Sequence, residues 1–334
     1  MTTTTWTTTA VVATHAGGPE VLERKTVSVP EPGTGELLVS VAAAGVNFID
    51  TYRRSGVYPM EYPSILGTEG AGTVVAVGPG TGDVAIGDRV AWSDAPGSYA
   101  GLVRVPAARA LPVPTDVDLQ VAAALPLQGL TAHYLATSTY PIARGDDVLL
   151  HAGAGGVGLL LTQLAVARGA RVITTVSTDE KEHLSRGAGA HDVIRYDRLT
   201  DLTAELPARV RDLTGGRGVH VVYDSVGKDT FDASLASLRT RGMLVLFGGS
   251  SGQVPPVDPQ RLNAAGSVYL TRPTLASYVA TRAELVDRAD ELFSAVRSGT
   301  LSVRVGATYA LEDAAQAHAA LESRATTGKV LLIP

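Results

Sequence analysis

The sequence predicts an α/β protein that combines a doubly wound parallel sheet of the Rossmann type with a separate β-rich unit. From Asp147 to about Thr271, strand patterns alternate with helix patterns, as they do in a parallel sheet. Between Ala10 and Ala110, short β runs are separated by Gly and Pro turns, which favours a compact barrel-like unit. A length of 334 residues is enough for two domains that each have their own core.

A glycine-rich turn between a buried strand and a buried helix is the clearest motif. The strand is expected at 147–151 and the helix at 159–168, and Gly153, Gly155 and Gly158 fit the pattern G-x-G-x-x-G between them. Glycines at this spacing allow a tight turn, close approach of the backbone to a pyrophosphate and close packing of helix on strand. The phosphate then lies at the positive helix N-terminus. Because a second strand follows on schedule, the turn predicts a dinucleotide site rather than an ordinary βα connection.

The remaining elements follow from the same patterns. The threonine-rich segment 1–9 is expected to be frayed at its start. In the β-rich region the clearest strands are expected at 36–42, 72–77, 88–92 and 101–105. A helix at 119–135 precedes the glycine turn, and further strands are expected at 171–176, 192–196, 219–223, 242–247 and 267–271. The helices between them are expected to begin near Asp179, to end at Gly215–Gly216, and to span 230–239.

The end of the chain is expected to return to the first domain, because chain ends often lie together. It comprises a long helix at 277–298, a strand near Val303, a helix at 311–323 and a closing strand at 329–333. The predicted division is therefore 1–124 with 266–334 for the β-rich domain, and 125–265 for the Rossmann domain.

Composition excludes several classes of function. A formal net charge of −5 argues against binding to nucleic acid or to an anionic membrane. The chain has no cysteine, so disulfides, thiolate ligands and thiolate nucleophiles are absent. No apolar run reaches the ~20 residues of a membrane span, and no signal peptide is recognisable, so a cytoplasmic location is expected. The seven histidines show no metal-ligand spacing with a third ligand nearby, which favours ordinary packing or surface roles.

The segment 248–252 spells G-x-S-x-G, the nucleophile elbow of α/β-hydrolases. Such an elbow must lead directly into a helix. Here three prolines follow within 253–259, and proline is incompatible with a helix interior, so the hydrolase interpretation is rejected.

Several longer motifs carry a resemblance to a known family. They are GVNFIDTYRRSGVYP (45–59), LGTEGAGTV (66–74), GLTAHYL (129–135), HAGAGGVG (151–158), VVYDSVG (221–227) and LESRATTGKVLLIP (321–334). Together they resemble the NADPH-dependent quinone oxidoreductases, zinc-free members of the medium-chain dehydrogenase/reductase superfamily related to zeta-crystallin. The resemblance implies a GroES-like catalytic domain beside the Rossmann domain, hydride transfer from NADPH to a quinone, and a homodimer formed through the Rossmann sheet.

The resemblance also bears on zinc. Zinc-dependent relatives place a cysteine and a histidine in the stretches that correspond to 45–48 and 67–69, where this chain has Asn47 and Thr68. Without zinc, no Lewis acid polarises an alcohol or carbonyl oxygen. Electron-poor acceptors such as quinones or conjugated enones are therefore favoured over alcohols.

NADPH is predicted over NADH from the end of the second Rossmann strand. NAD-selective sites have a carboxylate there, and NADP-selective sites have a cation instead. The strand ends at 175–178 without an acid, and the resemblance implies that Ser177, Lys181 and Tyr196 hold the 2′-phosphate. Asp179 and Glu180 complicate this prediction, although acids at a helix N-terminus also have a favourable interaction with the helix dipole.

The resemblance places Asn47 and Tyr52 beside the nicotinamide and the acceptor, as the catalytic candidates that also contact the cofactor. Further cofactor contacts are implied at Thr131, Tyr134, Gly155, Gly156, Val157, Gly158, Ser225, Phe247, Gly248, Gly249, Ser250 and Arg324. Tyr134 and Phe247 could instead serve only in packing.

Two alternatives stay open at this point. An enone or 2-enoyl-thioester reductase on the same fold would need a proton donor, for which Tyr52 or Tyr58 are the candidates. A quinone needs none, because solvent can protonate the hydroquinone anion. A non-enzymatic, crystallin-like NADPH-binding protein is the alternative from another class.

Overall fold

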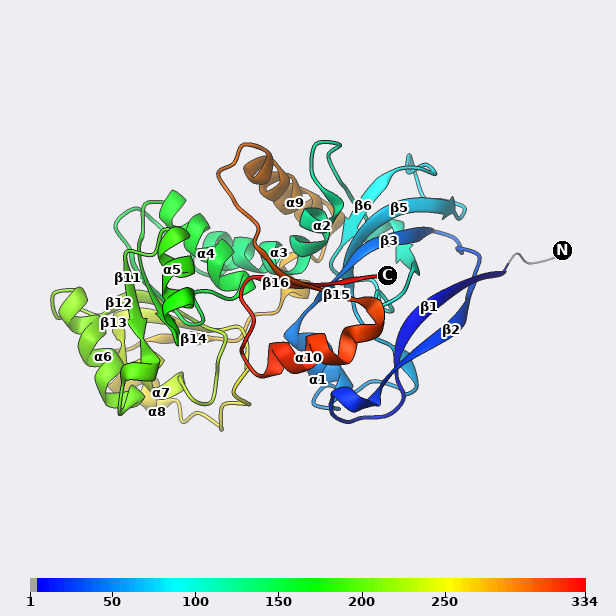
Figure 1. Ribbon diagram of the computed structural model, residues 1–334. Helices are drawn as coiled ribbons and strands as arrows, with labels where there is room; N and C mark the ends of the chain where they lie inside the picture. The colour runs from blue at the N-terminus through cyan, green and yellow to red at the C-terminus, as the bar shows by residue number, and fades with distance from the viewer. Residues whose placement is uncertain (1–4) are drawn as a thin grey trace. The chain divides into compact units, whose positions relative to one another are not determined.

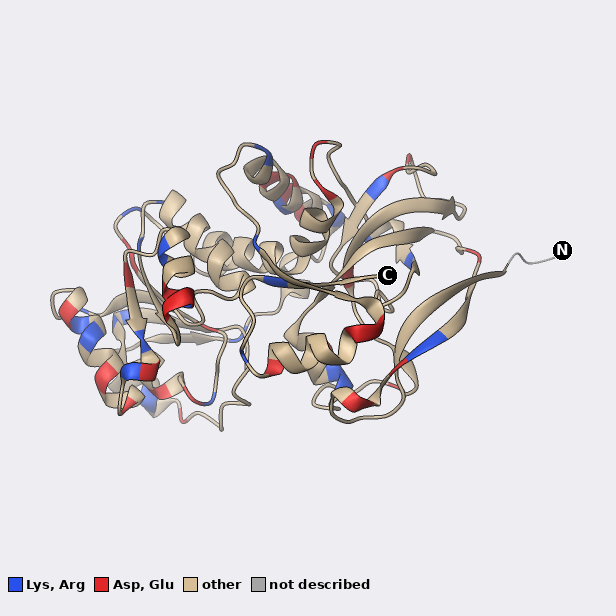
Figure 2. Ribbon diagram, viewed as in Figure 1, with Lys and Arg blue, Asp and Glu red and all other residues tan. Residues whose placement is uncertain are grey.

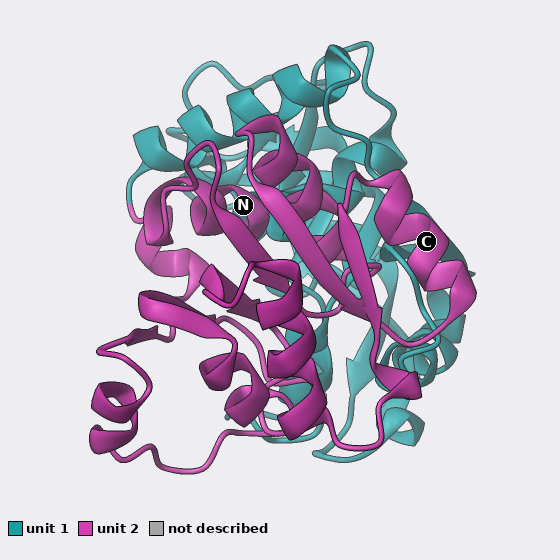
Figure 3. Cartoon of the chain, turned by 90° about the vertical axis from the view of Figure 1, so that its left-hand side faces the viewer, with its two compact units in different colours: residues 1–130, 281–334 teal, residues 131–280 magenta. Residues whose placement is uncertain are grey.

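The computed structural model describes residues 5–334, and the chain divides into two compact units (Figure 3). Unit 1 comprises Met1–Leu130 and Thr281–Pro334, and unit 2 comprises Thr131–Ala280. The sequence analysis expected the divisions at 124/125 and 265/266. The second division lies later because β14 (Tyr269–Thr271) pairs with a strand of the unit 2 sheet.

Unit 2 is built on a parallel sheet that has six strands within the described residues, in the order β11-β10-β9-β12-β13-β14 (Figure 1). Numbered along the chain, this order is 3-2-1-4-5-6, the order of a Rossmann fold. Its strands are β9 (Asp147–Leu150), β10 (Arg171–Val176), β11 (Asp192–Arg195), β12 (Val219–Asp224), β13 (Leu238–Leu246) and β14. The strand order reverses at β9, so the glycine turn after β9 lies where such sheets bind their ligands.

The helices of unit 2 cover this sheet with apolar faces. They are α4 (Gly156–Ala167), α5 (Asp179–Gly187), α6 (Leu202–Leu213), α7 (Phe231–Ala236) and α8 (Gln260–Ala264). In the core, Leu149 and Val222 of the sheet pack in one cluster with Leu206 of α6 and Phe231 of α7. Acidic and basic residues alternate on the outside of α6 (Figure 2), as expected for a solvated face.

Unit 1 is mainly antiparallel. Its larger sheet runs β15-β16-β3-β5-β6-β8, with β7 also pairing with β3, and a smaller sheet runs β2-β1-β4. The strands are β1 (Thr5–Ala13), β2 (Leu22–Pro30), β3 (Glu36–Val46), β4 (Ser64–Ile65), β5 (Glu69–Val77), β6 (Arg89–Trp92), β7 (Leu102–Pro106), β8 (Leu111–Pro112), β15 (Val305–Ala310) and β16 (Lys329–Ile333). Strand β16 lies between β15 and β3, so the end of the chain is part of this sheet.

Four helices belong wholly to unit 1, and a fifth crosses its boundary. They are α1 (Phe48–Arg54), α2 (Leu119–Ala124), α9 (Arg282–Arg297) and α10 (Ala314–Glu322), with α3 (Pro126–Tyr134) crossing the boundary. The core of unit 1 joins Val39 of β3 and Trp92 of β6 to Ala317 of α10 and Leu332 of β16. Residues from the start and the end of the chain therefore share one core.

Two helix expectations were wrong in their boundaries. The fraying expected at the start of the threonine-rich segment falls on residues 1–4, which lie outside the described residues. The threonines from Thr5 onward form β1 and pair with Pro30 and its neighbours, because β-branched side chains favour a paired strand. The helix expected at 119–135 is split, since Pro126 supplies no N–H to continue α2 and instead begins α3. The helix expected from 277 begins at Arg282, where Thr281 and Glu284 form a capping box.

In the part of the chain that the structure describes, no helix is both long and apolar enough to span a bilayer.

Candidate active site

The glycine turn of unit 2 has the form that its sequence predicted. Strand β9 leads into residues 151–155, and α4 begins at Gly156 with Gly155 as its N-cap. A Cβ atom on Gly158 would lie 2.2 Å from the carbonyl oxygen of Ala152, and one on Gly153 would lie 2.6 Å from Cβ of Thr174. Both glycines are therefore required by the protein's own packing, because no side chain fits at such distances.

Gly155 differs from the other two glycines of the motif. Its Cβ direction meets only Ala152, with the carbonyl oxygen at 3.2 Å, so its outer face is open. Gly155 has no side chain to cap the first N–H groups of α4, which include those of Gly156, Val157 and Gly158. An open backbone beside uncapped amides and a positive helix end fits a pyrophosphate group.

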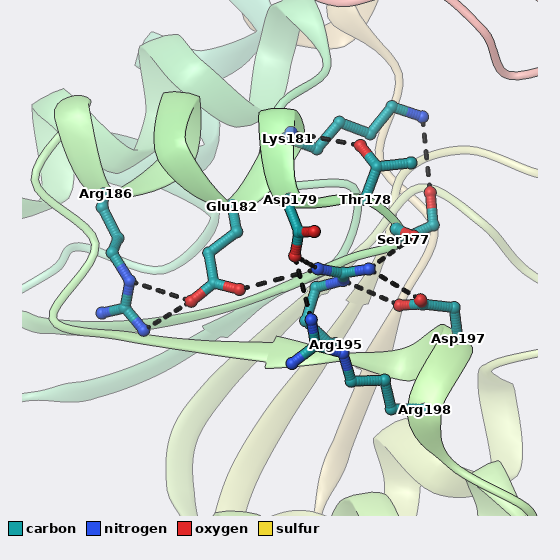
Figure 4. Close-up of polar contacts among 9 residues, drawn as sticks. All are labelled: Ser177, Thr178, Asp179, Lys181, Glu182, Arg186, Arg195, Asp197 and Arg198. Atoms are coloured by element: carbon teal, nitrogen blue, oxygen red, sulfur yellow. Dashed lines mark hydrogen bonds and ion pairs between the residues drawn. The ribbon is translucent and has the colours of Figure 1, made fainter.

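The carboxyl ends of β10 and β11 bring the expected 2′-phosphate residues together. Val176 pairs with Arg195, so Ser177 and Tyr196 follow side by side at the ends of the two strands. The ammonium of Lys181 reaches back from the first turn of α5 and lies 3.5 Å from Oγ of Ser177 (Figure 4). Three residues predicted from separate segments therefore lie in one place.

The ends of β12 and β13 also join as expected. The N–H of Phe247 donates to the carbonyl of Asp224 at 2.8 Å, and that of Ser250 donates to the carbonyl of Ser225 at 3.2 Å. A Cβ on Gly248 would lie 2.5 Å from the carbonyl oxygen of Ser225, so these loops touch closely. No helix follows Ser250 until α8 at Gln260, which removes the elbow geometry of a hydrolase.

A buried hydrogen-bond network beneath the glycine turn was missed by the sequence analysis. Asp224 accepts from the hydroxyls of Thr230 and Ser234, the latter at 2.6 Å. Since Ser234 donates to Asp224, it accepts from Nε2 of His151 at 2.9 Å, and Nδ1 of His151 accepts from Thr175. His151 is therefore neutral, and burial lowers its pKa.

The structure places Tyr134 and Thr131 on α3 and Arg324 just after α10. Tyr134 is 2% exposed and stacks on Tyr278 with 4.3 Å between ring centroids, which fits the packing alternative stated for it. Thr131 lies half-buried on α3. Arg324 follows α10 in unit 1 and is exposed, with a left-handed backbone φ of 59°. Their contacts with a cofactor stay predictions.

In unit 1, the Asn47 amide is held by a buried ion pair that the sequence analysis did not single out. Nδ2 of Asn47 donates to Oε2 of Glu69 at 2.7 Å, and its Oδ1 accepts from Nζ of Lys329 at 2.8 Å. Lys329 also donates directly to Glu69, and the N–H of Leu127 donates to Oε1 of Glu69 at 2.7 Å. The two charged side chains are 1% and 0% exposed. This network sets which end of the amide is oxygen and which is nitrogen.

Tyr52 lies one helical turn beyond Asn47 on α1. Its ring contacts those of Phe48 and Tyr58, at centroid distances of 6.2 and 5.4 Å. Tyr58 is exposed, whereas Phe48 packs against the core of unit 1, so this aromatic group lies at the edge of that core. The Tyr52 and Tyr58 rings meet edge to face, at an interplanar angle of 70°.

A second buried chain of hydrogen bonds joins α1 to α10. Arginine can only donate, so Nδ1 of His318 accepts from Arg54 at 3.1 Å and its Nε2–H donates to the Tyr99 hydroxyl at 3.1 Å. Tyr99 in turn donates to Asp50 at 3.1 Å, and Asp50 accepts from the N–H of Asn47 at 2.9 Å. Burial raises the pKa of Asp50 to about 6, and burial together with the charge of Arg54 lowers the pKa of His318 to about 3.

These shifts predict that the protein becomes less stable as the pH falls below about 6.5. The folded state keeps His318 and His151 neutral, so their contribution is complete above the unfolded pKa of 6.5 and is lost as pH falls. For His318 the loss is about 1.4 kcal/mol per pH unit well below 6.5, and His151 contributes in the same direction. Asp50 has the opposite effect on stability: because its pKa rises from 3.8 in the unfolded chain to about 6 in the folded protein, it stabilises the fold as the pH falls through that range. It is a single group, whereas two histidines destabilise the fold over the same range.

Urea midpoints measured at pH 7.5, 6.5 and 5.5 check this expectation. In His318→Gln the urea midpoint should change less with pH than it does in the wild type. His15→Gln, a change at an exposed histidine, should leave the pH dependence of the midpoint as in the wild type. A wild-type midpoint that is the same at pH 7.5 and 5.5 would contradict the assignment of two neutral buried histidines.

No metal-binding cluster is found among residues 5–334: no three His, Asp or Glu side chains come together in a way that could hold an ion. Asn47, which the sequence analysis set in place of a zinc ligand, lies within the Glu69–Lys329 network.

Comparison with known proteins agrees with this architecture. Residues 33–115 match the family model described as "Alcohol dehydrogenase GroES-like domain", and residues 156–295 match "Zinc-binding dehydrogenase". The chain is 47% identical to the Escherichia coli protein "Quinone oxidoreductase 1" over 322 residues, which is 95% of this chain and 97% of that protein. It is 41% identical to a "2-haloacrylate reductase" from a Burkholderia species over 333 residues, 97% and 98% of the two chains.

Among solved structures, a mycobacterial protein complexed with NADPH superposes with a TM-score of 0.94. It is 56% identical, and the match covers 98% of this chain and all of the other. Sequence identity of this size over nearly the whole length, together with the two-unit fold, shows that the chain belongs to the quinone oxidoreductase family of the medium-chain dehydrogenases and reductases.

Proposed function

We propose that this protein is an oxidoreductase that uses NADPH to reduce a quinone or a similar electron-poor acceptor. The observation that carries this proposal is the meeting of Ser177, Lys181 and Tyr196 at the ends of β10 and β11, beside the open turn at Gly155. A cation at that place, with no acid on the strand itself, suits a 2′-phosphate. The NADPH in the mycobacterial relative and the quinone oxidoreductase name of the Escherichia coli relative support the proposal.

Each part of the site has a distinct task in this reaction. The first amides of α4 bind the pyrophosphate, and the residues at the ends of β12 and β13 line the path of the dinucleotide. The bound cofactor supplies the hydride. Asn47, fixed by Glu69 and Lys329, orients the nicotinamide ring or the acceptor by hydrogen bonding. The phenol of Tyr52 donates a hydrogen bond to the acceptor oxygen as negative charge develops there.

The reaction is proposed to need no zinc. The chain has no cysteine, and Asn47 and Thr68 stand where zinc-dependent relatives have ligands. A quinone accepts hydride without a Lewis acid, and its hydroquinone anion is protonated by solvent, so the protein need only position the reactants.

A homodimer formed through unit 2 is a second proposal. Among the described residues, β14 pairs only with β13 and so leaves one edge of the sheet unpaired. Tyr269 on this strand is 59% exposed, and an exposed sheet edge with an apolar side chain is suited to pairing with a second copy.

One observation favours a second acceptor class. The Burkholderia relative is named for reduction of 2-haloacrylate, which is a conjugated carbon–carbon double bond. The same fold delivers hydride to such a bond if a group donates to the developing enolate, and Tyr52 offers a phenol for this.

NADPH oxidation against a panel of quinones, enones, 2-haloacrylates and enoyl thioesters tests the function. Turnover that is fastest with quinones is the expected result, and it should persist after exhaustive chelation. Faster turnover with a conjugated acid or thioester would favour the second class, and no NADPH oxidation with any acceptor would reject the enzyme.

Replacing Lys181 with alanine is expected to weaken NADPH binding by about ten- to a hundredfold, because a charge-assisted contact to the 2′-phosphate is lost. NADH binding should change little, since NADH has no phosphate at that position. Fluorescence titration with each cofactor makes the measurement. Equal weakening of NADPH and NADH would contradict the placement of Lys181 at the 2′-phosphate.

A further inference from the structure

The acids that follow β10 pose a problem for the binding of a phosphate monoester. Asp179 is the first residue of α5, two positions after Ser177, and its side chain is 85% exposed. A free carboxylate at this place would repel a 2′-phosphate and would favour a ribose hydroxyl instead. The exposed position alone does not remove that repulsion, because the carboxylate and the phosphate would lie within the range of Coulomb forces.

The structure shows what holds this carboxylate. The guanidinium of Arg195, at the end of β11, donates to Oδ1 of Asp179, and Arg198 donates to the same oxygen at 2.9 Å (Figure 4). Arg195 also donates hydrogen bonds to both carboxylate oxygens of Asp197, at 2.8 and 2.7 Å. Arg195 also lies 3.8 Å from Oε2 of Glu182 and donates to the carbonyl of Ser177 at 3.3 Å, so the same side chain reaches the residue expected to hold the phosphate.

Arg195 is placed rigidly for this task. Its side chain is only 10% exposed, and its planar group is fixed by contacts on three sides. Figure 4 shows the cations Lys181, Arg186, Arg195 and Arg198 with the carboxylates of Asp179, Glu182 and Asp197, and Glu180 follows Asp179 in the first turn of α5. The acids around the end of β10 are therefore balanced by an equal number of cations.

We propose that Arg195 is a positioning residue that makes the 2′-phosphate site selective for NADPH. It neutralises Asp179, holds that carboxylate against β11, and fixes the main chain at Ser177. The inference rests on the proposed use of NADPH and adds the reason why this chain tolerates an acid at the start of α5. Arg195 acts through Asp179 and Ser177 and is not required to touch the cofactor.

A purely structural role is the competing explanation, since Arg195 also ties β10 to β11. The two roles differ in what they do to selectivity. Loss of a structural tie weakens NADPH and NADH alike, whereas release of the Asp179 carboxylate weakens only the cofactor that carries the phosphate. The two roles also predict different results when Asp179→Asn is added to an Arg195 variant. Removing the charge of Asp179 restores NADPH binding only if the defect is electrostatic.

The test is a double-mutant cycle on the whole protein, with dissociation constants for NADPH and NADH measured by fluorescence titration. Arg195→Gln should weaken NADPH binding by about tenfold and NADH binding by less than about twofold, the scale expected for an unpaired charge near a phosphate. Asp179→Asn alone should leave NADPH binding within about threefold of the wild type, because its charge is already compensated. In the double variant, NADPH binding should return to within about threefold of the wild type.

Arg186→Gln is the matched control. Arg186 lies on α5, the helix that begins at Asp179, and among the residues drawn in Figure 4 it pairs only with Glu182. This variant should leave both dissociation constants unchanged. If Arg195→Gln fails to fold, Arg195→Lys keeps the charge while losing the planar fork, and NADPH binding should then fall by less than about fivefold with rescue by Asp179→Asn.

Equal loss of NADPH and NADH binding in Arg195→Gln, or no rescue by Asp179→Asn, would overturn the inference. A wild-type protein that binds NADH as tightly as NADPH would instead reject the proposed cofactor preference itself. The wild-type titration therefore separates failure of the proposed function from failure of the role given to Arg195.

Discussion

Replacement of Lys329 with methionine is expected to destabilise unit 1 by about 3–5 kcal/mol, the scale of breaking a buried ion pair from one side. The change leaves the carboxylate of Glu69, which is fully buried, with hydrogen bonds only from Asn47 and from the N–H of Leu127. It also removes the donor that fixes Oδ1 of Asn47, so turnover should fall even in protein that is still folded. The urea midpoint and the rate of NADPH oxidation are the two measurements.

Two further variants make this expectation specific. Lys329→Met combined with Glu69→Gln removes the stranded charge and should recover part of the stability, because both partners are then neutral. Arg104→Met breaks an exposed pair with Glu36 on the same sheet and should change stability by no more than about 1 kcal/mol. A Lys329→Met protein as stable and as active as the wild type would exclude any role for this network.

Replacement of Gly158 with alanine is expected to lower the affinity for NADPH by about a hundredfold, the scale of a displacement near 1 Å at a binding site. The added methyl would lie 2.2 Å from the carbonyl oxygen of Ala152, so α4 must move away from the turn. Such overpacking also destabilises by about 1–3 kcal/mol. Titration with NADPH, together with thermal unfolding of unit 2, gives both quantities.

Gly187→Ala is the control for this change. Gly187 is the last residue of α5, and a methyl added there meets nothing within 4 Å. It should leave NADPH binding as in the wild type and should not lower stability, since alanine is the better helix former. If Gly158→Ala bound NADPH as tightly as Gly187→Ala does, the close contact at Ala152 would be irrelevant to the site.

The parts of the site that are local in sequence could be predicted from sequence. Strand β9, the turn and α4 lie within 25 residues, so glycine spacing and hydrophobic runs were enough to place them. Lys181 and Ser177 are only four positions apart and follow a recognisable strand, so their meeting was also predictable. The element order of the parallel sheet followed from the same alternation.

Contacts between distant segments could not be predicted in this way. Asn47 is the N-cap of α1, Glu69 lies on β5 and Lys329 lies on β16, and nothing in the pattern of one segment indicates which partner another will supply. Glu69 and Lys329 stood inside quoted family motifs, yet a motif identifies a segment and not the residue that its side chain contacts. The pairing of Arg195 with Asp179 likewise depends on strand register. Boundary errors arose where a single proline or cap decided the end of a helix.

The position of β16 inside the unit 1 sheet has a consequence for how the chain is made. Unit 2 is continuous in sequence, so all of it has been synthesised before Thr281 is added. Unit 1 lacks β16 until residues 329–333 have left the ribosome, and Glu69 has no ammonium partner until Lys329 arrives. The nucleotide-binding unit is therefore complete during translation, whereas the side chains that hold Asn47 assemble only after it. We therefore expect a nascent chain stalled shortly before residue 329 to have all of unit 2 but not yet the ammonium that holds the Asn47 amide.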